Sequence, residues 1–492
     1  MALSSVVVMY RTNPVSGQTQ CSSRFDGATT QLVVVFLVAF GLRAAFVMLV
    51  PYSPWSDAAD YDGLGWKLAL GLGYTNSGGE PTAIFPPLYP LALAGIYSLF
   101  GHSVLAARFL NIVLDSITAL ILYFTARELL GDCPPSNRAF PFTCGLLYAI
   151  NPITIYMSGV TMTEVFFSTV LVTLFLLAVR NSRRHLGGSY VVSRVRKQIM
   201  TFGLSGVFGG LAALTKANVV PVWAFLVYRS TFGWRTRKQS QAIVIAGLLF
   251  SLTIAPWVVR NWLVSGRAVA FSSHGPGWAY CAGTVYQGPF FEPLPFSASH
   301  ESEWDEAEAC GQILLQHVIT HPIQYLWNTV RRAGHMLDLN IEAFILAFSE
   351  LTYGQGYSRV SGFLKSNPWF TSMALLPMFQ SVIWVGGGLV GLHGRFGLPY
   401  RVTILATILL WVFSYAVFTG YPRYFIPMIP FLTLPLAHLV VCFKDRRLGT
   451  SAVAAPPLGF VHKLSDVTIT LTMILAAGTW ITTGIALISR VQ

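Results

Sequence analysis

The chain has 492 residues, of which 54% are hydrophobic and only 11% are charged. A water-soluble protein of this length could not bury so much apolar surface, so a polytopic, all-α membrane protein is expected. The apolar runs are continuous, which argues against an outer-membrane barrel, and basic loops on one side of a membrane explain the net charge of +12 better than nucleic-acid binding does.

The first part of the chain is expected to be a polar cytoplasmic segment, residues 1–30, followed by a first span at 31–51 that acts as an anchor. Residues 52–103 are expected to form the first external loop of a transmembrane module covering 31–258. Further spans are expected near 104–126, 139–157, 162–180 and 241–258, the last ending at Pro256-Trp257. Two shorter apolar pieces, 200–214 and 217–229, predict a helical hairpin or a partly re-entrant element broken around Lys216.

The second part of the chain begins with a long mixed segment, 259–368, which is expected to be an external loop with an amphipathic helical stretch at about 301–337. Residues 369–492 are expected to hold the C-terminal transmembrane helices, near 369–391, 402–420, 424–442 and 466–488. The chain would then cross the membrane about eleven times.

Clusters of Lys and Arg indicate the topology of these spans. Threading the spans up and down places the basic clusters within 180–198, 229–238, 393–401 and 444–447 on one side, which the positive-inside rule assigns to the cytoplasm. The acidic residues of 52–103 and 301–308 fall on the opposite side. The first external loop is therefore expected outside a plasma membrane.

Three carboxylates begin this external loop. Asp57 and Asp60 share one face of an expected helix over 57–72, whose apolar face would hold Tyr61, Leu64, Leu68 and Leu72. Two close carboxylates beside an apolar surface raise the pKa of at least one of them, which suits a general base. Alternatively, Asp57 caps the helix N-terminus. Asp62 is expected to be a solvated surface charge.

A further acidic candidate, Glu164, lies at the outer end of an otherwise apolar span. An ionisable side chain at the edge of a membrane helix is a functional candidate. A capping box, with Thr161 as the cap and Glu164 three residues later, explains the same pattern.

Three basic residues, Lys216, Arg260 and Arg423, are expected at the external face, against the positive-inside trend. Arg grips phosphate in a fork geometry, so an anionic lipid head group or a phosphate would explain the set. The alternative is that they snorkel to the interface beside Trp and Tyr anchors. Close spacing of Gly203, Gly206, Gly209 and Gly210 predicts tight helix packing.

The six Cys residues show no metal-ligand spacing, although Cys281 and Cys310 fall in one external loop and could pair in an oxidising compartment. Asp57, Asp60 and Glu164 are compatible with a divalent ion, but no spacing requires one. The sequence therefore requires no cofactor and no metal site.

Several motifs in chain order resemble the polyprenyl-phosphate-sugar-dependent glycosyltransferases of the GT-C superfamily. This group includes the dolichyl-phosphate-mannose protein mannosyltransferases, the lipid A aminoarabinose transferases and the RgtA/B/C/D-like proteins. The resemblance rests on Asp57-x-x-x-Tyr61, Leu70-Gly71-Leu72-Gly73-Tyr74, Pro86-Pro87-Leu88-Tyr89-Pro90-Leu91, Thr163-Glu164, Gly210-Leu211-Ala212-x-Leu214-Thr215-Lys216, Pro256-Trp257-x-x-Arg260-Asn261 and Arg423-Tyr424-x-x-Pro427-x-x-Pro430.

The resemblance implies an inverting glycosyltransferase of the bacterial plasma membrane, with 31–258 as its catalytic module. It would move a sugar from a polyprenyl phosphate to an extracytoplasmic glycan, lipid or protein, and it would bind no nucleic acid. Asp57 would be the base, Glu164 the second acid and Asp60 a helper, while Arg260, Arg423 and Lys216 would bind the donor phosphate. Expected pocket residues are Tyr61, Tyr89, Asn261 and Tyr424.

One departure from the family pattern lies in the first external loop. Many relatives carry Lys or Arg immediately before the Pro-Pro, where this chain has Ile84-Phe85. The proline-rich run is then better interpreted as a rigid support than as a phosphate clamp. The alternative function, a multi-span transporter or lipid flippase, predicts mid-bilayer charges and inverted repeats. The nearest such charges are Arg43, Arg108 and Asp115, and no internal repeat is visible.

Overall fold

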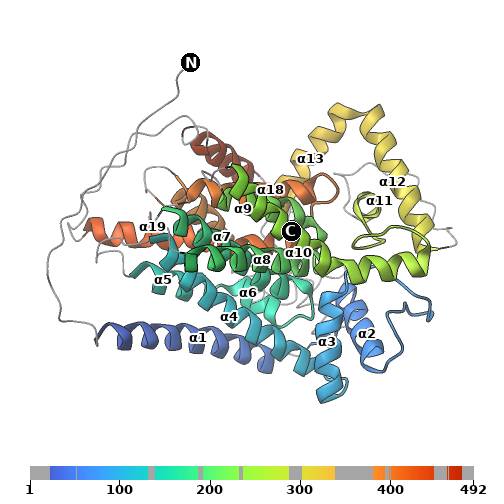
Figure 1. The fold of residues 1–492 in the computed structure, drawn as a ribbon, viewed down its shortest axis with the longest axis horizontal. Helices are drawn as coiled ribbons and strands as arrows, with labels where there is room; N and C mark the ends of the chain where they lie inside the picture. The colour runs from blue at the N-terminus through green and yellow to red at the C-terminus, as the bar shows by residue number, and fades with distance from the viewer. Residues whose placement is uncertain are drawn as a thin grey trace, which may run out of the picture.

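The fold is helical throughout the part of the chain that this computed structural model describes, namely residues 23–50, 52–130, 139–186, 192–231, 236–286, 302–337, 380–393, 398, 400–447, 463 and 465–478. Within these ranges the β-structure consists of one isolated bridge between Thr75 and Pro81. The expected all-α class is confirmed. Most of the long helices run side by side along one direction (Figure 1).

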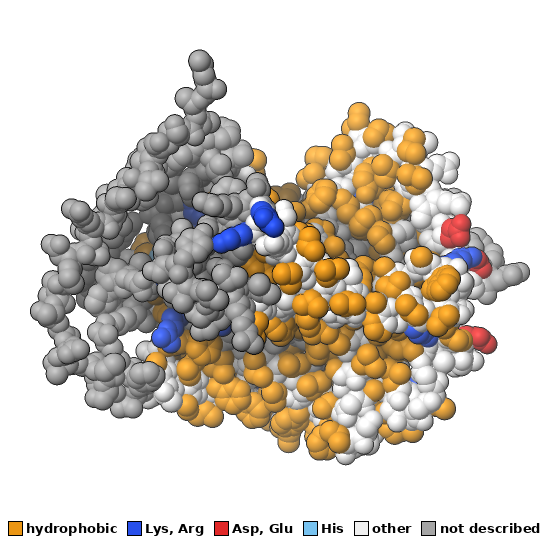
Figure 2. All heavy atoms as spheres, in the orientation of Figure 1, with side chains coloured by type: hydrophobic (Ala, Val, Ile, Leu, Met, Phe, Trp, Pro, Cys, Tyr) orange, Lys and Arg blue, Asp and Glu red, His pale blue; other side chains and the backbone are white. Residues whose placement is uncertain are grey.

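Five stretches of the described chain are long and apolar enough to cross a membrane, within α1 (Ser23–Leu49), α4 (Val104–Leu130), α7 (Thr163–Leu186), α10 (Thr236–Ser265) and Pro422–Lys444, which joins η7 (Pro422–Met428) to α19 (Ile429–Arg447). A further apolar pair, α5 (Ala139–Ala149) and α6 (Pro152–Ser158), meets at a bend of 56° and forms either a broken sixth span or a re-entrant loop. The protein is therefore a multi-pass membrane protein. Figure 2 shows hydrophobic side chains covering the middle of the molecule.

Shorter apolar helices occupy other regions where spans are expected. They include part of α8 (Val192–Ala213), α18 (Arg401–Ala416), residues 465–478, and the joined pair η5 (Val382–Gly386) and α17 (Gly387–Gly391). A further apolar helix, α3 (Leu88–Phe100), follows the proline-rich run of the first loop. Residues 369–379 and 479–488 of two expected spans lie outside the described ranges, and the count of about eleven stays a prediction.

Glycines bring α8 and α10 into direct backbone contact. A Cβ on Gly206 would lie 2.3 Å from the carbonyl oxygen of Ala246, and one on Gly210 would lie 2.6 Å from the side chain of Thr253. Neither position can hold a larger residue without separating the helices. The small-residue spacing therefore predicted the packing correctly.

The expected end of the span at Pro256-Trp257 is wrong, because α10 continues through Pro256 to Ser265. Proline removes one backbone donor, a loss that membrane helices tolerate where neighbouring groups compensate. The helix ends instead at Gly266, which adopts φ +66° and donates its N–H to the carbonyl of Trp262 at 2.8 Å. This geometry is typical of glycine just beyond a helix C-terminus.

The two ends of the bundle differ in charge. At one end, Arg180 and Arg183 pair with Glu128 of α4, and Arg229 lies over the ring of Tyr400. Side chains of Arg194, Arg196 and Lys197, and residue Arg395, lie outside the described part. The other end holds α2 (Asp57–Ala69), α11 (Pro276–Tyr286), α12 (Glu303–Thr320) and α13 (Pro322–Met336). On the face drawn in Figure 2, the carboxylates gather at this second end.

The amphipathic stretch expected at 301–337 consists of two helices, α12 and α13, which form an arch beside α11 (Figure 1). The break falls at His321-Pro322, where proline occupies the first turn of α13. Proline suits this position because the first helical N–H groups have no intrahelical acceptor.

Candidate active site

Asp57 is the first residue of α2, and its carboxylate forms an ion pair with a residue far away in the sequence. Its Oδ2 accepts a hydrogen bond from Nη2 of Arg423 at 2.5 Å. The N-cap position belongs to Ser56, whose side chain makes no capping hydrogen bond. The interpretation of Asp57 as a helix cap is therefore wrong, because its charge is directed at Arg423.

The residue preceding Asp57 has an unusual backbone conformation. Ser56 has φ 49° and ψ −138°, a combination that side-chain-bearing residues rarely adopt. Such strain costs on the order of 1–3 kcal/mol and persists only where the surrounding structure imposes it. Here it turns the chain sharply into α2, so that the first carboxylate of the helix meets Arg423.

Arg423 lies in the short helix η7 between aromatic rings. Its guanidinium carbon is 5.1 Å from the ring centre of Tyr424, and Nη2 also donates to the hydroxyl of Tyr424 at 3.3 Å. Tyr424 in turn stacks on Tyr415 of α18. The Nε of Arg423 is buried and has no hydrogen-bond partner among the described atoms. The guanidinium therefore retains a donor for another ligand.

Glu164 and Lys216 form the second ion pair of the site. Glu164, 1% exposed, lies in the first turn of α7, and its Oε1 accepts a hydrogen bond from Nζ of Lys216 at 3.1 Å. Lys216 directly precedes η2 (Ala217–Val219), in the break between α8 and α9 (Val220–Ser230). Its Nζ is 5.5 Å from the ring centre of Tyr424. The other carboxylate oxygen of Glu164 has no partner among the described atoms.

The capping-box interpretation of Glu164 is wrong, because α7 begins at Thr163 rather than after Thr161. The hydroxyl of Thr161 instead lies 3.0 Å from that of Tyr52, and its N–H donates to the same tyrosine oxygen at 3.2 Å. The carboxylate of Glu164 remains available for Lys216.

The two ion pairs form one cluster, because both cations lie against Tyr424. We call Asp57, Arg423, Tyr424, Lys216 and Glu164 the charge cluster. Its members come from α2, η7, the α8–α9 break and α7, so four separate parts of the chain converge on it. Four of the six charged residues that the sequence singled out are thus brought together.

The electrostatic environment separates the two neighbouring carboxylates of α2. Burial alone would raise the pKa of Asp57, but Arg423, together with Lys216 and His274, lowers it below its ordinary value. Asp60 lies on the exposed side, where desolvation and the charge of Asp57 raise its pKa. Asp57 is therefore the more strongly ionised of the two.

His274 is a neighbour of Asp57 that the sequence did not single out. Its ring stacks on Trp278 at 3.7 Å, and burial lowers its pKa to about 4, although Asp57 opposes that shift. The imidazole is therefore neutral at physiological pH and can donate or accept a hydrogen bond. Because its spacing matches no ligand motif, only the fold reveals its position.

Arg260 lies at the same end of the bundle but is bound to the first external loop. It donates to the carbonyl oxygens of Thr82 at 2.6 Å and Tyr74 at 2.8 Å. The neighbouring side chain of Asn261, fully buried, donates to the carbonyl of Val269 at 3.0 Å. In this structure Arg260 positions the first external loop, whereas Asn261 positions the segment that follows α10.

Two tyrosines expected to line the substrate pocket are buried in the packing between α2, the loop and α3. Tyr61 is 6% exposed and Tyr89 is fully buried, and their ring centres lie 5.5 Å apart. Phe85 approaches Tyr61 to 4.5 Å from the position where many relatives carry a cation. The apolar residue completes this aromatic packing.

The proline-rich run supports the segment that carries Lys216. The N–H of Leu88 donates to the carbonyl of Leu214 at 3.1 Å, two residues before Lys216. This bond ties the start of α3 to the end of α8. The contact agrees with the interpretation of the run as a rigid support.

The expectation that Asp62 is a solvated surface charge is wrong, because its side chain is buried between α2 and the region that follows α3. Tyr97 donates its hydroxyl to Oδ1, and Nε2 of His102 lies 2.8 Å from Oδ2. Helical spacing could not reveal these partners, since they lie on another element. Leu72 also differs from expectation, because α2 ends at Ala69 and Leu72 is 61% exposed.

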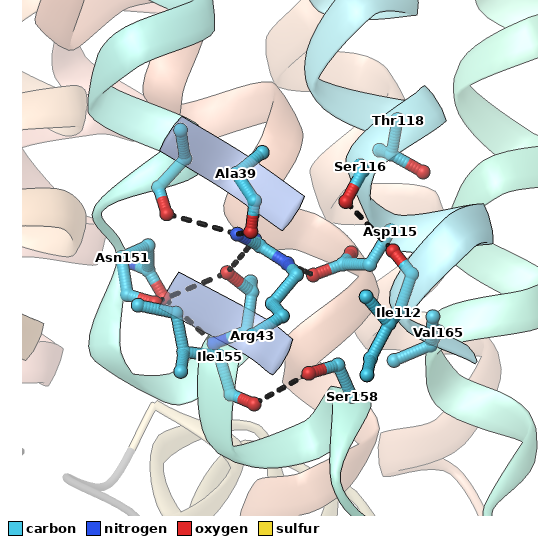
Figure 3. Close-up of polar contacts among 12 residues, drawn as sticks. Ala39, Arg43, Ile112, Asp115, Ser116, Thr118, Asn151, Ile155, Ser158 and Val165 are labelled. Atoms are coloured by element: carbon cyan, nitrogen blue, oxygen red, sulfur yellow. Dashed lines mark hydrogen bonds and ion pairs between the residues drawn. The ribbon is translucent and has the colours of Figure 1, made fainter. Parts of the chain in front are cut away.

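A buried polar network holds the bend between α5 and α6. Arg43 of α1, fully buried, donates Nε to Asp115 at 2.6 Å and Nη1 to the carbonyl of Ala149 at 2.9 Å. Its Nη2 donates to the hydroxyl of Thr154 on α6 at 3.0 Å. Figure 3 shows Arg43 pointing between α4 and the α5–α6 bend. Arg43 therefore binds a carbonyl that the bend leaves without its helical partner.

The loop between α6 and α7 is fixed by two further residues of α4. Arg108 donates to the carbonyl of Gly159 at 2.7 Å, and Asn111 donates to that of Val160 at 2.8 Å. This loop leads directly to Glu164. The polar residues of α4 thus set the position of the second ion pair.

The compatibility of Asp57, Asp60 and Glu164 with a divalent ion stays a prediction. Across the residues with described positions, no group of three or more His, Cys, Asp or Glu side chains could hold a metal ion. Asp57 and Glu164 are each paired with a cation instead.

Comparisons with known proteins address the fold. The chain is similar to the archaeal oligosaccharyltransferase AglB from Archaeoglobus fulgidus, with a TM-score of 0.51 and 14% identity over 93% of this chain and 56% of that one. The apo form of the oligosaccharyltransferase from the same organism gives a TM-score of 0.50 with 15% identity, over 92% of this chain and 55% of that one. This chain therefore shares its fold with these two oligosaccharyltransferase structures. It spans little more than half the length of these two structures.

A sequence comparison matches the middle part of the chain to a family model. Residues 85–259 match the family model described as dolichyl-phosphate-mannose-protein mannosyltransferase. Of the charge cluster, Glu164 and Lys216 fall inside this match, whereas Asp57 and Arg423 lie outside it. ArnT from Cupriavidus metallidurans, bound to undecaprenyl phosphate, gives a TM-score of 0.44 with 11% identity, over 93% of this chain and 72% of that one. No curated protein matches this chain in sequence.

Proposed function

We propose that the protein is an inverting membrane glycosyltransferase that moves a sugar from a polyprenyl phosphate to an acceptor outside the cytoplasm. The observation that carries the proposal is the charge cluster, where a buried carboxylate and two cations meet at one end of an apolar bundle with a GT-C fold. The basic residues at the opposite end of the bundle support a cytoplasmic location for that end under the positive-inside rule.

The chemistry follows from the separate roles of the cluster. Asp57 takes the proton of the acceptor hydroxyl while the acceptor oxygen attacks the anomeric carbon of the donor. The bond between that carbon and the phosphate oxygen breaks, and its electron pair leaves with the polyprenyl phosphate. Arg423 and Lys216 stabilise the negative charge that develops on this phosphate.

Donor binding would also prepare the base. In this structure, Arg423 holds Asp57 ionised and lowers its pKa, which makes the carboxylate a weak base. A donor phosphate competes for the same guanidinium, and Nε offers it an unused donor. Once Arg423 turns to the phosphate, it no longer lowers the pKa of Asp57. The burial of Asp57 then raises this pKa. The base would therefore gain strength when the donor is present.

Glu164 would keep Lys216 in place. Its carboxylate is almost inaccessible and directs Nζ toward Tyr424, beside Arg423. Its second oxygen, without a described partner, offers an acceptor site to a hydroxyl of either substrate. Because Arg423 and Lys216 can meet the charge of the phosphate, the proposed reaction does not depend on a divalent ion.

A lipid-linked sugar assay in living cells tests the proposal. In a strain that lacks the protein, the polyprenyl-phosphate sugar should accumulate and the extracytoplasmic glycan should lose that sugar, both visible by mass spectrometry. The wild-type gene should restore the pattern. Asp57→Asn should not, because loss of a general base slows transfer by about 100- to 10,000-fold.

Glu80→Gln is the matched control, since Glu80 is an exposed carboxylate of the same loop. It should restore the glycan fully. Both variants must reach the membrane in wild-type amounts. Full restoration by Asp57→Asn, or an unchanged pool of lipid-linked sugars in the deletion strain, would contradict the proposed function.

The transporter or flippase alternative is not favoured. Its best candidates were the charges nearest to mid-span, but Arg43 and Asp115 bind each other and neighbouring polar groups. Arg108 is bound to backbone carbonyls. These residues stabilise helix ends and loops, a sufficient reason for their presence in the bundle.

A further inference from the structure

Two of the cysteines in the described chain face each other across the interface between α11 and α12. Cys281 and Cys310 are both fully buried, and their thiols lie within hydrogen-bonding distance of one another. The other two described cysteines, Cys144 and Cys442, belong to α5 and α19.

The backbones of the two helices approach closely at this point. A Cβ on Gly277, one turn before Cys281, would lie 2.5 Å from the backbone nitrogen of Gly311 and 2.9 Å from the carbonyl carbon of Cys310. Near the same crossing, the indole of Trp278 donates to Glu306 at 3.0 Å. Disulfides require closely spaced backbones, and here Gly277 permits that spacing.

The environment of the pair does not favour other roles of cysteine. Burial raises the pKa of both thiols, which leaves them protonated and weakly nucleophilic. No group of three metal-ligating side chains occurs among the residues that the structure covers. A buried, unreactive pair in contact is instead typical of a structural bridge.

The compartment follows from what α11 and α12 contact. The carboxylate of Glu303, the first residue of α12, accepts hydrogen bonds from the hydroxyl of Thr82 and the N–H of Ala83. The N–H of Ser273, just before α11, donates to the carbonyl of Ala83 at 2.9 Å. Both helices therefore lie at the end of the molecule that holds Asp57. This end faces an oxidising compartment if the orientation given under the proposed function holds.

We infer that Cys281 and Cys310 form a disulfide in the mature protein. The oxidant would be a disulfide-bearing thiol oxidase of the extracytoplasmic compartment. During folding, before α11 and α12 bury the pair, one cysteine thiolate attacks the oxidant's disulfide to give a mixed disulfide, and the second cysteine displaces the oxidant. A Sγ–Sγ bond forms between Cys281 and Cys310, and the oxidant leaves as a dithiol with both electrons and two protons.

The bridge would stabilise the two helices, α11 and α12, that pack against the first external loop. It joins α11 to α12, and α12 supplies the carboxylate that holds Thr82 and Ala83. Arg260 binds the carbonyl of Thr82 from α10. The loop that leads from α2 to the proline-rich run is thus held between α10 and the cross-linked helices.

Peptide mapping tests the disulfide directly. The full-length protein, purified from a host with an oxidising compartment, is denatured in N-ethylmaleimide without reductant, digested and analysed by mass spectrometry. A cross-linked peptide should join Cys281 to Cys310, while Cys144 and Cys442 should carry the alkyl group. Alkylation of both Cys281 and Cys310, or a link from either to another cysteine, would overturn the inference.

Thermal unfolding tests what the bridge does. Reductant should lower the Tm of the wild type by several degrees, because an intact disulfide restricts the unfolded chain. Cys442→Ser should show the same response, whereas Cys281→Ser should begin at the lower Tm and not respond. A Cys281→Ser variant that still loses stability in reductant would rule out this pair as the cause.

Neither measurement needs a sugar-transfer assay. Free thiols in a protein that transfers sugar would overturn the disulfide and leave the proposed function intact. A disulfide between Cys281 and Cys310, in a protein whose deletion changes no glycan, would confirm the bridge and contradict the proposed function.

Discussion

At the scale of single residues, the proposed function requires one guanidinium, that of Arg423, to bind two anions in turn. Arg423 is bound to Asp57 and lies against Tyr424, as Lys216 does, and under the proposed function it would also bind the donor phosphate. The ion pair keeps the carboxylate of Asp57 charged, but it also engages one of the oxygens that would accept the proton. Exchange of Arg423 between the two anions would couple donor binding to the strength of the base.

The pH dependence of transfer should reveal this exchange. In the wild type, the acid limb of kcat/KM should lie below the ordinary range of a carboxylate, because Arg423 lowers the pKa of Asp57 in the free enzyme. Replacing Arg423 with Gln leaves burial as the main influence, so the pKa rises and the limb moves to higher pH. Activity should also fall by about 100-fold or more, since a cation that stabilises the phosphate is lost.

Arg267→Gln is the control for that experiment, because Arg267 is a partly exposed arginine paired with Asp305. It should leave both the limb and the rate unchanged. An Arg423→Gln enzyme whose limb stays at the wild-type pH would show that the ion pair does not control the charge of Asp57. The pH of the acid limb is determined from relative rates within one variant, so it can be measured even for a slow enzyme.

At the scale of elements, the packing of α8 against α10 positions two functional groups. Lys216 follows the end of α8, and Arg260 lies near the end of α10. The backbones meet at Gly206, where an added Cβ would lie 2.3 Å from the carbonyl oxygen of Ala246. Because the obstacle is backbone, a rotamer change cannot relieve it.

Gly206→Ala should therefore destabilise the protein by about 1–3 kcal/mol, the usual cost of overpacking a core. It should also slow transfer, because separation of the helices shifts Lys216. Gly247→Ala on α10 is the matched control, since an added Cβ there meets nothing within 4 Å. Thermal unfolding in detergent measures the first effect. Equal Tm values for the two variants would disprove the close approach.

These elements also show what the sequence can predict. The spans can be predicted from local hydropathy, and the topology can be predicted from the clusters of Lys and Arg between them. Both signals lie in short stretches of sequence. The end of α10 was misplaced because Pro256 looks like a terminus, whereas the helix ends at Gly266. A glycine after Ser265 was the available signal, and its role depends on a positive φ that hydropathy does not encode.

The site was partly predictable for the same reason. The charged motifs of Asp57, Glu164, Lys216 and Arg423 stand out in apolar surroundings, and a family resemblance placed them together. Partner choice was not predictable, because it depends on contacts between distant parts of the chain. Asp62 is buried against residues of a later helix and loop, and Arg260 binds carbonyls of the first loop instead of joining the charge cluster.

At the scale of the whole molecule, one buried ion pair connects the first span to the rest of the bundle. Arg43 binds Asp115 of α4, a carbonyl at the end of α5 and a hydroxyl of α6. Tyr148 donates its hydroxyl to the other oxygen of Asp115 at 2.5 Å. The pair and its neighbours therefore set the relative positions of four helices.

Arg43→Met should destabilise the protein by about 3–5 kcal/mol, because it leaves the charge of Asp115 buried without its cation. The double variant Arg43→Met/Asp115→Leu should recover only part of this loss, since the carbonyl of Ala149 still lacks a donor. Arg180→Met removes a partly exposed ion pair and should cost about 1 kcal/mol or less. Thermal unfolding measures all three; similar Tm values for Arg43→Met and Arg180→Met would refute the role of the network.

A first membrane helix can act purely as an anchor, and any apolar helix of suitable length could then replace it. α1 does not meet that description, because Arg43 lies two turns before its end and braces the bend that leads to the loop before Glu164. A chimaera with an unrelated anchor would insert and still misplace the second ion pair. A functional exchange would need an arginine at the matching depth, which makes α1 part of the machinery that positions the site.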